Sequence, residues 1–207
     1  MRQIYLCRHG KTAWNAERRI QGLNDIELNH KGLKQADFLA KFLKSQINAP
    51  IRIISSPLLR AKQTAAVIGE ALDVPVETDE RIIEINTGIF TGKCLDELAT
   101  DEAWQAHLRD PWGEGYGVGG ESAESVRTRV MSLIHEAIVS KDERDLLLVT
   151  HASPIRHAIM AMLDIPPRHL YHIVVHNASV SLFEDREGFY KSVYINLNPA
   201  MFFEKVV

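Results

Sequence analysis

Three predicted strands end beside side chains that can do chemistry. The apolar run "QIYLC" is followed at once by Arg8-His9-Gly10, and the apolar run "DLLLVT" leads directly to His151. A third run, "IRIIS", leads to Ser56-Pro57, which we interpret as an N-cap and first helical residue, so that Arg60 falls in the first turn of a helix. Ligands of open α/β sheets bind beyond the carboxyl ends of the strands. We therefore expect these side chains to meet at one place.

The charges of this set indicate the kind of ligand. It contains two arginines and two histidines, and Ser153-Pro154 repeats the Ser-Pro signal, so a helix beginning at Pro154 would place its N-terminus beside His151. The unpaired amides of a helix N-terminus favour an anion. We predict that the set binds a dianion, and specifically a phosphate group.

The elements that must hold these residues alternate between strands and helices along the chain. Apolar residues at helical spacing predict one helix from about Leu33 to Ile47, a second after Ser56-Pro57 and a third capped by Ser122. Near the end, "ASVSLFE" and "FYKSVYINL" flank a turn at residues 185–188 and predict a hairpin. This order predicts an α/β fold: a three-layer α/β/α sandwich with a mostly parallel mixed sheet and the hairpin at its edge.

One segment between the helices lacks a clear pattern. Residues 95–121 are interpreted as irregular, with a glycine-rich stretch "GEGYGVGGES". Trp104, Trp112 and Tyr116 in it could face a substrate or pack within a lid. We expect one domain over residues 1–207, with a lid or insertion at about 86–121.

Composition excludes several classes of protein. The chain has 207 residues, 45% of them hydrophobic and 25% charged, with a net charge of -3, which is typical of a globular protein and not of a nucleic-acid or membrane-surface binder. No stretch approaches the roughly 18 apolar residues that span a bilayer, and the N-terminal apolar stretch is too short for a secretory signal. Cys7 and Cys94 predict no disulfide framework. We expect a cytoplasmic protein; its oligomeric state stays open, a homodimer being one option.

Five sequence blocks in order carry a family resemblance. They are "RHGKTAWN", "RRIQGLNDIELNHKGLKQA", "SSPLLRAKQTA", "IIEINTGIFTG" and "VTHASPIRHAI". With them the chain resembles the histidine phosphatase superfamily, the phosphoglycerate-mutase-like proteins, in the branch marked by this RHG signature. Within this superfamily, these sequence blocks most resemble those of broad-specificity and α-ribazole phosphatases. The resemblance implies a phosphoglycerate-mutase-like sandwich and a phosphatase that needs no metal and no cofactor.

The resemblance also implies roles for the residues at the strand ends. His9 would be the nucleophile that becomes phosphohistidine, and Arg8, Arg60 and His151 would form the phosphate pocket. Imidazole attacks phosphorus only when neutral, and we expect the neighbouring arginines to lower the pKa of His9 by like-charge repulsion. Arginine forks match the phosphoryl oxygens that carry charge in the transition state.

Glu84 would be the general acid of this scheme. An alcohol leaving group must gain a proton, so this carboxyl must start protonated, which requires a raised pKa. The neighbouring isoleucines, at positions 82, 83 and 85, are consistent with partial desolvation. Glu80 and Asp79 lie close by in the sequence and are the rival candidates for this role.

Four further positions would contact the phosphate or the substrate. Asn15 and the Gln21-Gly22 pair follow the RHG block, and Ala152 follows the second histidine, where glycines or small apolar residues are common in the family. The substrate would be a small phosphorylated metabolite, with no nucleic acid or membrane as partner.

Three alternatives accompany this interpretation. The helical spacing of His169, His172 and His176 invites a metal site, which we disfavour because Pro166-Pro167 disrupts the segment before it. A cofactor-dependent phosphoglycerate mutase would use the same phosphohistidine, but family mutases follow the acid glutamate with an arginine-histidine-tyrosine-glycine stretch, and Glu84 is followed by "INTGIFTGKCLDEL". A member without activity could act as a sensor of a phosphorylated ligand.

Overall fold

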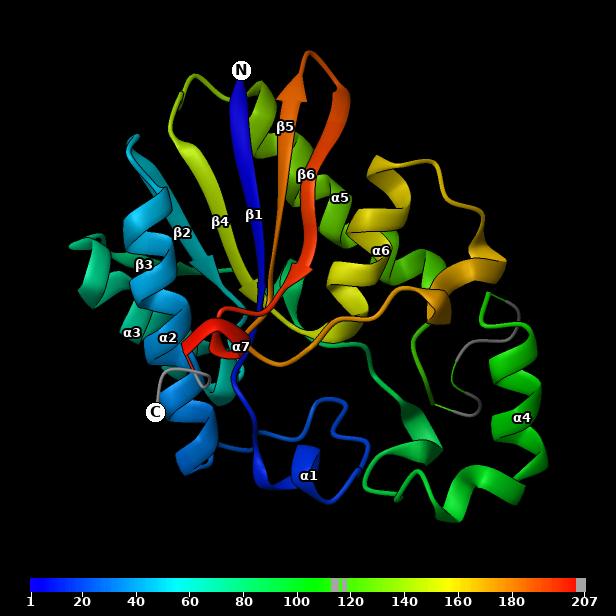
Figure 1. Cartoon of the computed structure of the whole chain (residues 1–207). Coiled ribbons are helices and arrows are strands. Elements are labelled where there is room, and N and C mark those ends of the chain that lie inside the picture. The colour runs from blue at the N-terminus through cyan, green and yellow to red at the C-terminus, as the bar shows by residue number, and fades with distance from the viewer. Residues whose placement is uncertain (113–115, 117–118, 204–207) are drawn as a thin grey trace.

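Six strands form one mixed sheet in the order β3-β2-β4-β1-β5-β6 (Figure 1). The computed structural model describes residues 1–112, 116 and 119–203. The strands are β1 (Arg2–Arg8), β2 (Ile51–Ser55), β3 (Val76–Thr78), β4 (Asp145–Thr150), β5 (Val180–Arg186) and β6 (Phe189–Leu197). The first four run parallel, and β5 pairs antiparallel with both β1 and β6. The mostly parallel sheet with a hairpin at its edge is as predicted.

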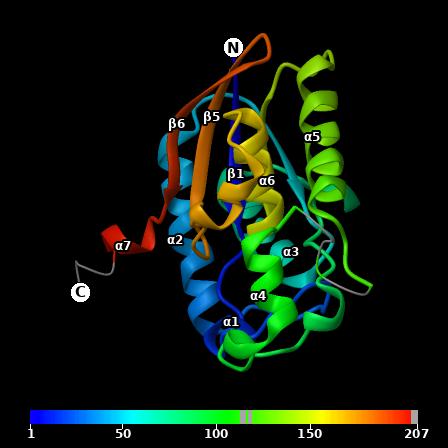
Figure 2. The same cartoon turned by 90° about the vertical axis from the view of Figure 1, so that its right-hand side faces the viewer.

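Helices cover both faces of this sheet, which makes the three layers. On one face lie α2 (His30–Gln46) and α3 (Leu59–Leu72), and on the other α5 (Ala123–Val139) and α6 (Ala152–Met162) (Figure 2). The alternation of side chains along β1 divides the core accordingly. Ile4 and Leu6 pack with the α5–α6 layer, whereas Tyr5 and Cys7 pack with the α2–α3 layer. All four side chains are buried, so β1 is sealed on both sides and ends in the interior.

The remaining elements are short. They are the helices α1 (Ala13–Ala16), α4 (Glu102–Arg109) and α7 (Ala200–Phe203) and the 3-10 turns Glu80–Ile82, Gly88–Phe90, Glu97–Thr100 and Pro167–His172. The prediction that residues 95–121 are irregular was wrong for the segment that forms α4. The Asp101 carboxylate caps this helix by accepting from the Trp104 amide at 2.9 Å, and the Trp104 ring packs edge-on against Phe90. A helix of eight residues is too short to show a clear apolar period.

Two helix starts differ from the prediction. Helix α3 begins at Leu59, two residues after Pro57, with Leu58 at the N-cap position. The Asp25 carboxylate accepts from the Leu59 amide at 2.5 Å, and the Ser56 hydroxyl bonds to His151 and accepts from the Leu58 amide at 3.4 Å. Helix α6 begins at Ala152, with His151 itself at the N-cap position. In both places the serine-proline pair lies near the helix start, but the proline is not the first helical residue. Leu33, expected on the apolar face of α2, is 45% exposed.

Within the described residues, no helix is both long enough and apolar enough to cross a membrane. Cys7 and Cys94 are free thiols, the first buried in β1 and the second half-buried.

Candidate active site

The carboxyl ends of β1, β2 and β4 meet at one edge of the sheet. The His9 amide donates to the carbonyl of Thr150 at 3.0 Å, and the Ser56 amide donates to the carbonyl of Val149 at 2.9 Å. These backbone bonds extend the parallel ladder by one residue on each side of β4. As a result, the rings of His9 and His151 lie 5.1 Å apart between centroids, although the residues are far apart in the sequence.

The imidazole of His9 is buried and oriented by its own neighbour. Its Nδ1 lies 2.7 Å from the carbonyl oxygen of Gly10, and its exposed fraction is 1%. A carbonyl oxygen can only accept, so Nδ1 carries the proton and Nε2 keeps its lone pair. Burial is the largest cause that lowers the pKa of His9 well below its usual value, and the charges of Arg8 and Arg60 lower it further. The like-charge repulsion that the sequence predicts is thus present, but burial has the larger effect.

His151 is held from the neighbouring strand. Its Nε2 lies 2.7 Å from the Ser56 hydroxyl, which follows β2, and its side chain is fully buried. Burial, then the charge of Arg60, holds the pKa of His151 well below its usual value. Both histidines are therefore neutral at pH 7.

The two arginines are anchored by carbonyl oxygens. Arg8 Nη1 donates to Val175 at 2.6 Å, and Arg60 donates through Nη1 to Asn24 at 2.7 Å and through Nη2 to Gly22 at 2.9 Å. Burial lowers the pKa of Arg8 to about 10, so that it stays charged at neutral pH, and burial also lowers the pKa of Arg60.

Three buried polar atoms of this cluster have no hydrogen-bond partner among the described residues. They are Nε of Arg8, Nε of Arg60 and Nδ1 of His151. Leaving such atoms unpaired costs free energy, and buried polar groups in proteins are paired as a rule. Unpaired donors on two guanidinium groups suit an anion with several acceptor oxygens.

Glu84 lies at the N-terminus of α6. Its Oε1 accepts from the amide of Ser153 at 3.3 Å and from the amide of Ile85 at 3.0 Å. The rival carboxylates are placed differently: Asp79 pairs with Arg81 at 2.6 Å, and Glu80 is exposed in the 3-10 turn that precedes Glu84.

A cavity of about 440 Å³ opens in front of this cluster. The predicted site residues that line it are Arg8, His9, Asn15, Gln21, Gly22, Glu84 and Ala152. The other two, Arg60 and His151, are completely buried behind its wall. Of the predicted lid aromatics, Trp104 and Tyr116 line the cavity, whereas Trp112 packs on the ring of His157 at 5.4 Å.

The secondary contacts are pre-arranged by hydrogen bonds. Thr12 donates through its hydroxyl to Gln21 Oε1 at 3.0 Å and through its amide to Asn15 Oδ1 at 3.2 Å. Occupation of both oxygens turns the amide nitrogens of Asn15 and Gln21 toward donation elsewhere. Gly22 has φ +49°, and a Cβ there would stand 2.5 Å from the Thr87 hydroxyl. This position therefore requires glycine, and its carbonyl anchors Arg60.

Comparison with known proteins settles the family. Residues 4–198 match the histidine phosphatase superfamily, branch 1. The chain belongs to this superfamily. A Salmonella paratyphi A protein named "Probable phosphoglycerate mutase GpmB" is 32% identical over 189 residues, which is 91% of this chain and 87% of that protein.

Solved structures of other phosphatases share the fold. A mutant phosphoserine phosphatase from Entamoeba histolytica in complex with phosphoserine superposes with a TM-score of 0.85 at 29% identity, covering 96% of this chain and 98% of that one. A mycobacterial glucosyl-3-phosphoglycerate phosphatase in complex with VO3 gives a TM-score of 0.86 at 29% identity, covering 95% and 99%. The α/β/α fold predicted from the sequence is thus the fold of these phosphatases.

Several residues around the site of this superfamily member were not foreseen. Asn177 Nδ2 lies 3.2 Å from the His9 carbonyl and 3.1 Å from Asn15 Oδ1, and Thr64 accepts from the Gly10 amide at 3.0 Å. Ser56 was interpreted as a helix cap. No local pattern marks Asn177, because its position beside His9 follows from the pairing of β5 with β1. Ser56 was marked by the serine-proline pair, but that pair is equally typical of a helix N-cap, which is how it was interpreted.

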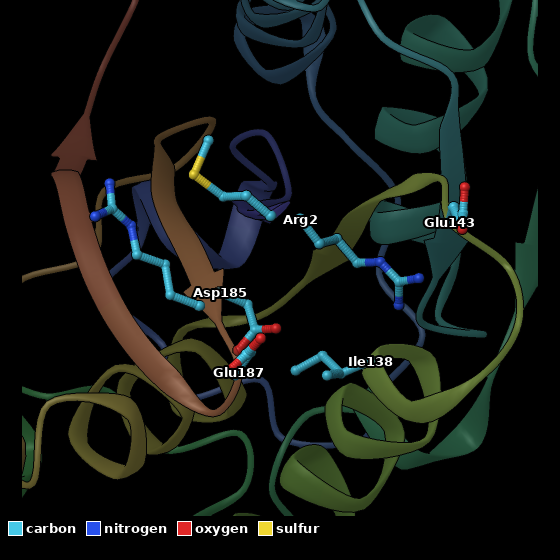
Figure 3. Close-up of a pocket in the computed structure, with 7 residues that line it drawn as sticks. Arg2, Ile138, Glu143, Asp185 and Glu187 are labelled. Atoms are coloured by element: carbon cyan, nitrogen blue, oxygen red, sulfur yellow. The ribbon is translucent and has the colours of Figure 1, made fainter.

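A larger cavity, of about 790 Å³, lies at the opposite end of the sheet (Figure 3). It is bounded by the start of β1 and the β5–β6 turn, with Arg2, Glu143, Asp185 and Glu187 on its wall. The Arg2 guanidinium is already bonded to the carbonyls of Ala137 and Asp142. None of the residues predicted for chemistry lies there.

The three histidines after α6 do not join the active site. His169 and His172 approach each other at 3.1 Å between Nδ1 atoms. Over the described residues, no group of three or more histidine, cysteine, aspartate or glutamate side chains is arranged to hold a metal ion.

Proposed function

We propose that this chain is a phosphomonoester hydrolase that acts on a small phosphorylated metabolite through a phosphohistidine at His9. The observation that carries the proposal is the buried, neutral imidazole of His9, aimed by Gly10, beside unpaired buried donors of Arg8 and Arg60. The names of the solved phosphatase neighbours support hydrolysis of phosphate esters.

In the first step, the lone pair of His9 Nε2 attacks phosphorus in line with the leaving oxygen. The P–O bond breaks, its electron pair goes to the leaving oxygen, and Glu84 transfers its proton to that oxygen, so that an alcohol departs. In the second step, ionised Glu84 takes a proton from a water molecule, which attacks the phosphohistidine. The P–N bond breaks, inorganic phosphate is released, and neutral His9 and protonated Glu84 are restored.

Arg8, Arg60 and His151 stabilise the charge that develops on the phosphoryl oxygens. The removal of one such donor typically costs about 3 kcal/mol of transition-state stabilisation. Asn15, Gln21, Gly22 and Ala152 line the same cavity and complete the contacts to phosphate or substrate. Because side chains of the protein supply the positive charge, we propose that the reaction needs neither metal nor cofactor.

The segment 86–121 is proposed as a lid on a single domain. Trp104 and Tyr116 from this segment line the cavity with Ile85, Thr87 and Leu95, which supports a covering role. A cytoplasmic location stays a prediction, supported by the two free thiols.

A phosphoglycerate mutase is the second candidate, since the Salmonella relative carries that name. Both activities share the phosphohistidine, and they differ in whether it donates its phosphate to water or back to an acid. Incubation with 3-phosphoglycerate and a trace of 2,3-bisphosphoglycerate separates them. Isomerisation faster than release of inorganic phosphate would replace the hydrolase with the mutase.

The decisive test is p-nitrophenyl phosphate hydrolysis at pH 5 to 7 in the presence of a chelator, followed by trapping of the phosphoenzyme. We expect turnover and an acid-labile, base-stable phosphoprotein, both of which disappear in His9→Ala while circular dichroism shows an intact fold. A phosphoenzyme that survives in His9→Ala would refute the nucleophile. Binding of phosphate esters without any turnover would favour the sensor.

A further inference from the structure

Arg156 is a cation of the cavity wall that the proposed mechanism does not use. It lies on α6 and lines the cavity together with His9, Glu84 and Ala152. Its Nε donates to the carbonyl of Ile173 at 2.9 Å, and its guanidinium carbon lies 5.6 Å from the centre of the Tyr171 ring. These contacts fix the plane of the guanidinium but use only one of its five N–H donors.

Besides Arg8 and Arg156, two other arginines line this cavity, and each already forms an ion pair. Arg18 pairs with Asp96 at 2.9 Å, and Arg19 pairs with Glu17 at 3.2 Å. Arg156 forms no ion pair with any residue that the structure describes. Among the described residues that line the cavity, Glu84 is the one carboxylate, and it is assigned to proton transfer. The charge of Arg156 also reaches the phosphate pocket, where it opposes protonation of Arg8 and lowers its pKa.

The position of Arg156 on its helix sets its distance from the phosphate pocket. It follows Ala152 by four residues, which is about 6 Å along the axis of α6, on the same face of the helix. Long helical side chains point back toward the N-terminus. We therefore expect the guanidinium to lie within the reach of a chain of two or three carbons attached to a phosphate held at Arg8 and His9.

We propose that Arg156 binds a carboxylate of the substrate, so that the enzyme prefers short phosphorylated carboxylic acids. This inference rests on the proposed phosphatase function. A guanidinium fork matches a carboxylate with two parallel hydrogen bonds, and one fixed cation balances one negative charge. The hydroxyls of Tyr116 and Tyr171, 3.0 Å apart on the same wall, add polar partners for it.

The test compares 3-phosphoglycerate with glycerol 3-phosphate, which has a hydroxymethyl group where the former has its carboxylate. Phosphate release gives kcat and KM for both substrates. We expect the wild type to prefer 3-phosphoglycerate, and Arg156→Gln to lower that preference by about 10- to 100-fold, the range for a hydrogen bond to a charged group. Arg156→Lys should keep part of the preference, because it retains the charge but not the fork. Arg127→Gln, on the exposed side of α5, should keep the wild-type preference.

The outcomes separate the two proposals. Equal losses on both substrates in Arg156→Gln would assign Arg156 to support of Tyr171 and overturn the inference, as would a wild type without preference. A stronger preference for fructose 1,6-bisphosphate, which has no carboxylate, would assign the cation to a second phosphate and also overturn it. If the wild type fails even on p-nitrophenyl phosphate and forms no phosphoenzyme, the phosphatase function itself fails, and this inference falls with it.

Discussion

The backbones of Gly10 and Gly32 are in contact, and this contact packs the turn after His9 against the first turn of α2. A Cβ built on Gly10 would overlap the carbonyl of Gly32, and one built on Gly32 would overlap the backbone of Lys11. Asn29 completes the contact, since it caps α2 through Gly32 and donates to the carbonyl of Thr12 at 3.0 Å. The block "NHKG", residues 29–32, therefore supports the turn that carries His9, the proposed nucleophile.

Gly32→Ala should impair both stability and activity. Overpacking of this kind costs about 1–3 kcal/mol, and the shift of the turn moves His9 away from the site. A misplacement of 1 Å can cost roughly 100-fold in rate, so we expect at least a tenfold loss of kcat on p-nitrophenyl phosphate.

Gly188→Ala is the matched control: its φ of +89° makes an alanine there strained as well, but open space surrounds it. It should lose stability in urea titrations and keep full activity. Full activity in Gly32→Ala would contradict the inference that the Gly10–Gly32 contact positions His9.

Glu84→Gln should distinguish leaving groups. Glutamine cannot donate a proton to an alkoxide, whereas nitrophenolate leaves without one. We expect kcat/KM for glycerol 3-phosphate to fall at least 100-fold, and for p-nitrophenyl phosphate at most tenfold. The ratio of the two losses, measured on one enzyme preparation, is the quantity that decides. Equal losses would mean that another group is the acid.

Arg129 positions the segment that carries Glu84. Its guanidinium donates to the carbonyls of Arg81 at 2.8 Å, Ile83 at 2.6 Å and Glu84 at 3.3 Å, and it pairs with Glu121 through two hydrogen bonds. Arg129→Met should destabilise the protein by about 2–3 kcal/mol, since three carbonyls and a carboxylate lose a charged partner. It should also reduce hydrolysis of alkyl phosphates more than that of aryl phosphates.

Arg127→Met on the same helix is the control for this experiment, because its side chain is exposed and makes none of these contacts. It should match the wild type in urea midpoint and in both rates. If Arg129→Met loses stability but the two rates fall in equal proportion, Arg129 supports the fold and not the orientation of Glu84.

Buried histidines should make the protein less stable in mild acid. Burial is the main cause that lowers the pKa values of His9, His151 and His157, to about 4 for His157. The unfolded chain binds protons at these sites near pH 6.5, so their contribution to stability is complete above that pH. As the pH falls toward the folded pKa, each histidine costs about 1.4 kcal/mol per pH unit.

Urea titrations at pH 7, 6 and 5 measure this slope. His157→Gln should remove one histidine's share of it, and His135→Gln, at an exposed position on α5, should leave the slope as in the wild type. A free energy of unfolding that stays constant from pH 7 to 5 would contradict the neutral state of the buried imidazoles.

Local patterns predicted the strand ends but not their full surroundings. An apolar run followed by Arg8-His9 or by His151 is visible in the sequence because a buried strand and its terminal polar residue are adjacent in the chain. Ser56 was visible too, but it is not the N-cap of the helix: its hydroxyl bonds to His151 and to the amide of Leu58, the residue before that helix. Asn177 and Arg156 have no such mark. The first is placed by the pairing of β5 with β1, and the second by the packing of α6 on the sheet, and both depend on contacts distant in sequence.

The strand order has a consequence for synthesis of the protein. Strand β4 lies between β1 and β2, so the first two strands have no shared edge until residues 145–150 leave the ribosome. Until then the nascent polypeptide presents two apolar strands with open hydrogen-bonding edges, which favour aggregation and chaperone capture. Insertion of β4 closes this gap and brings His151 beside His9 in one event, so we expect completion of the sheet and of the proposed phosphate pocket to coincide during translation.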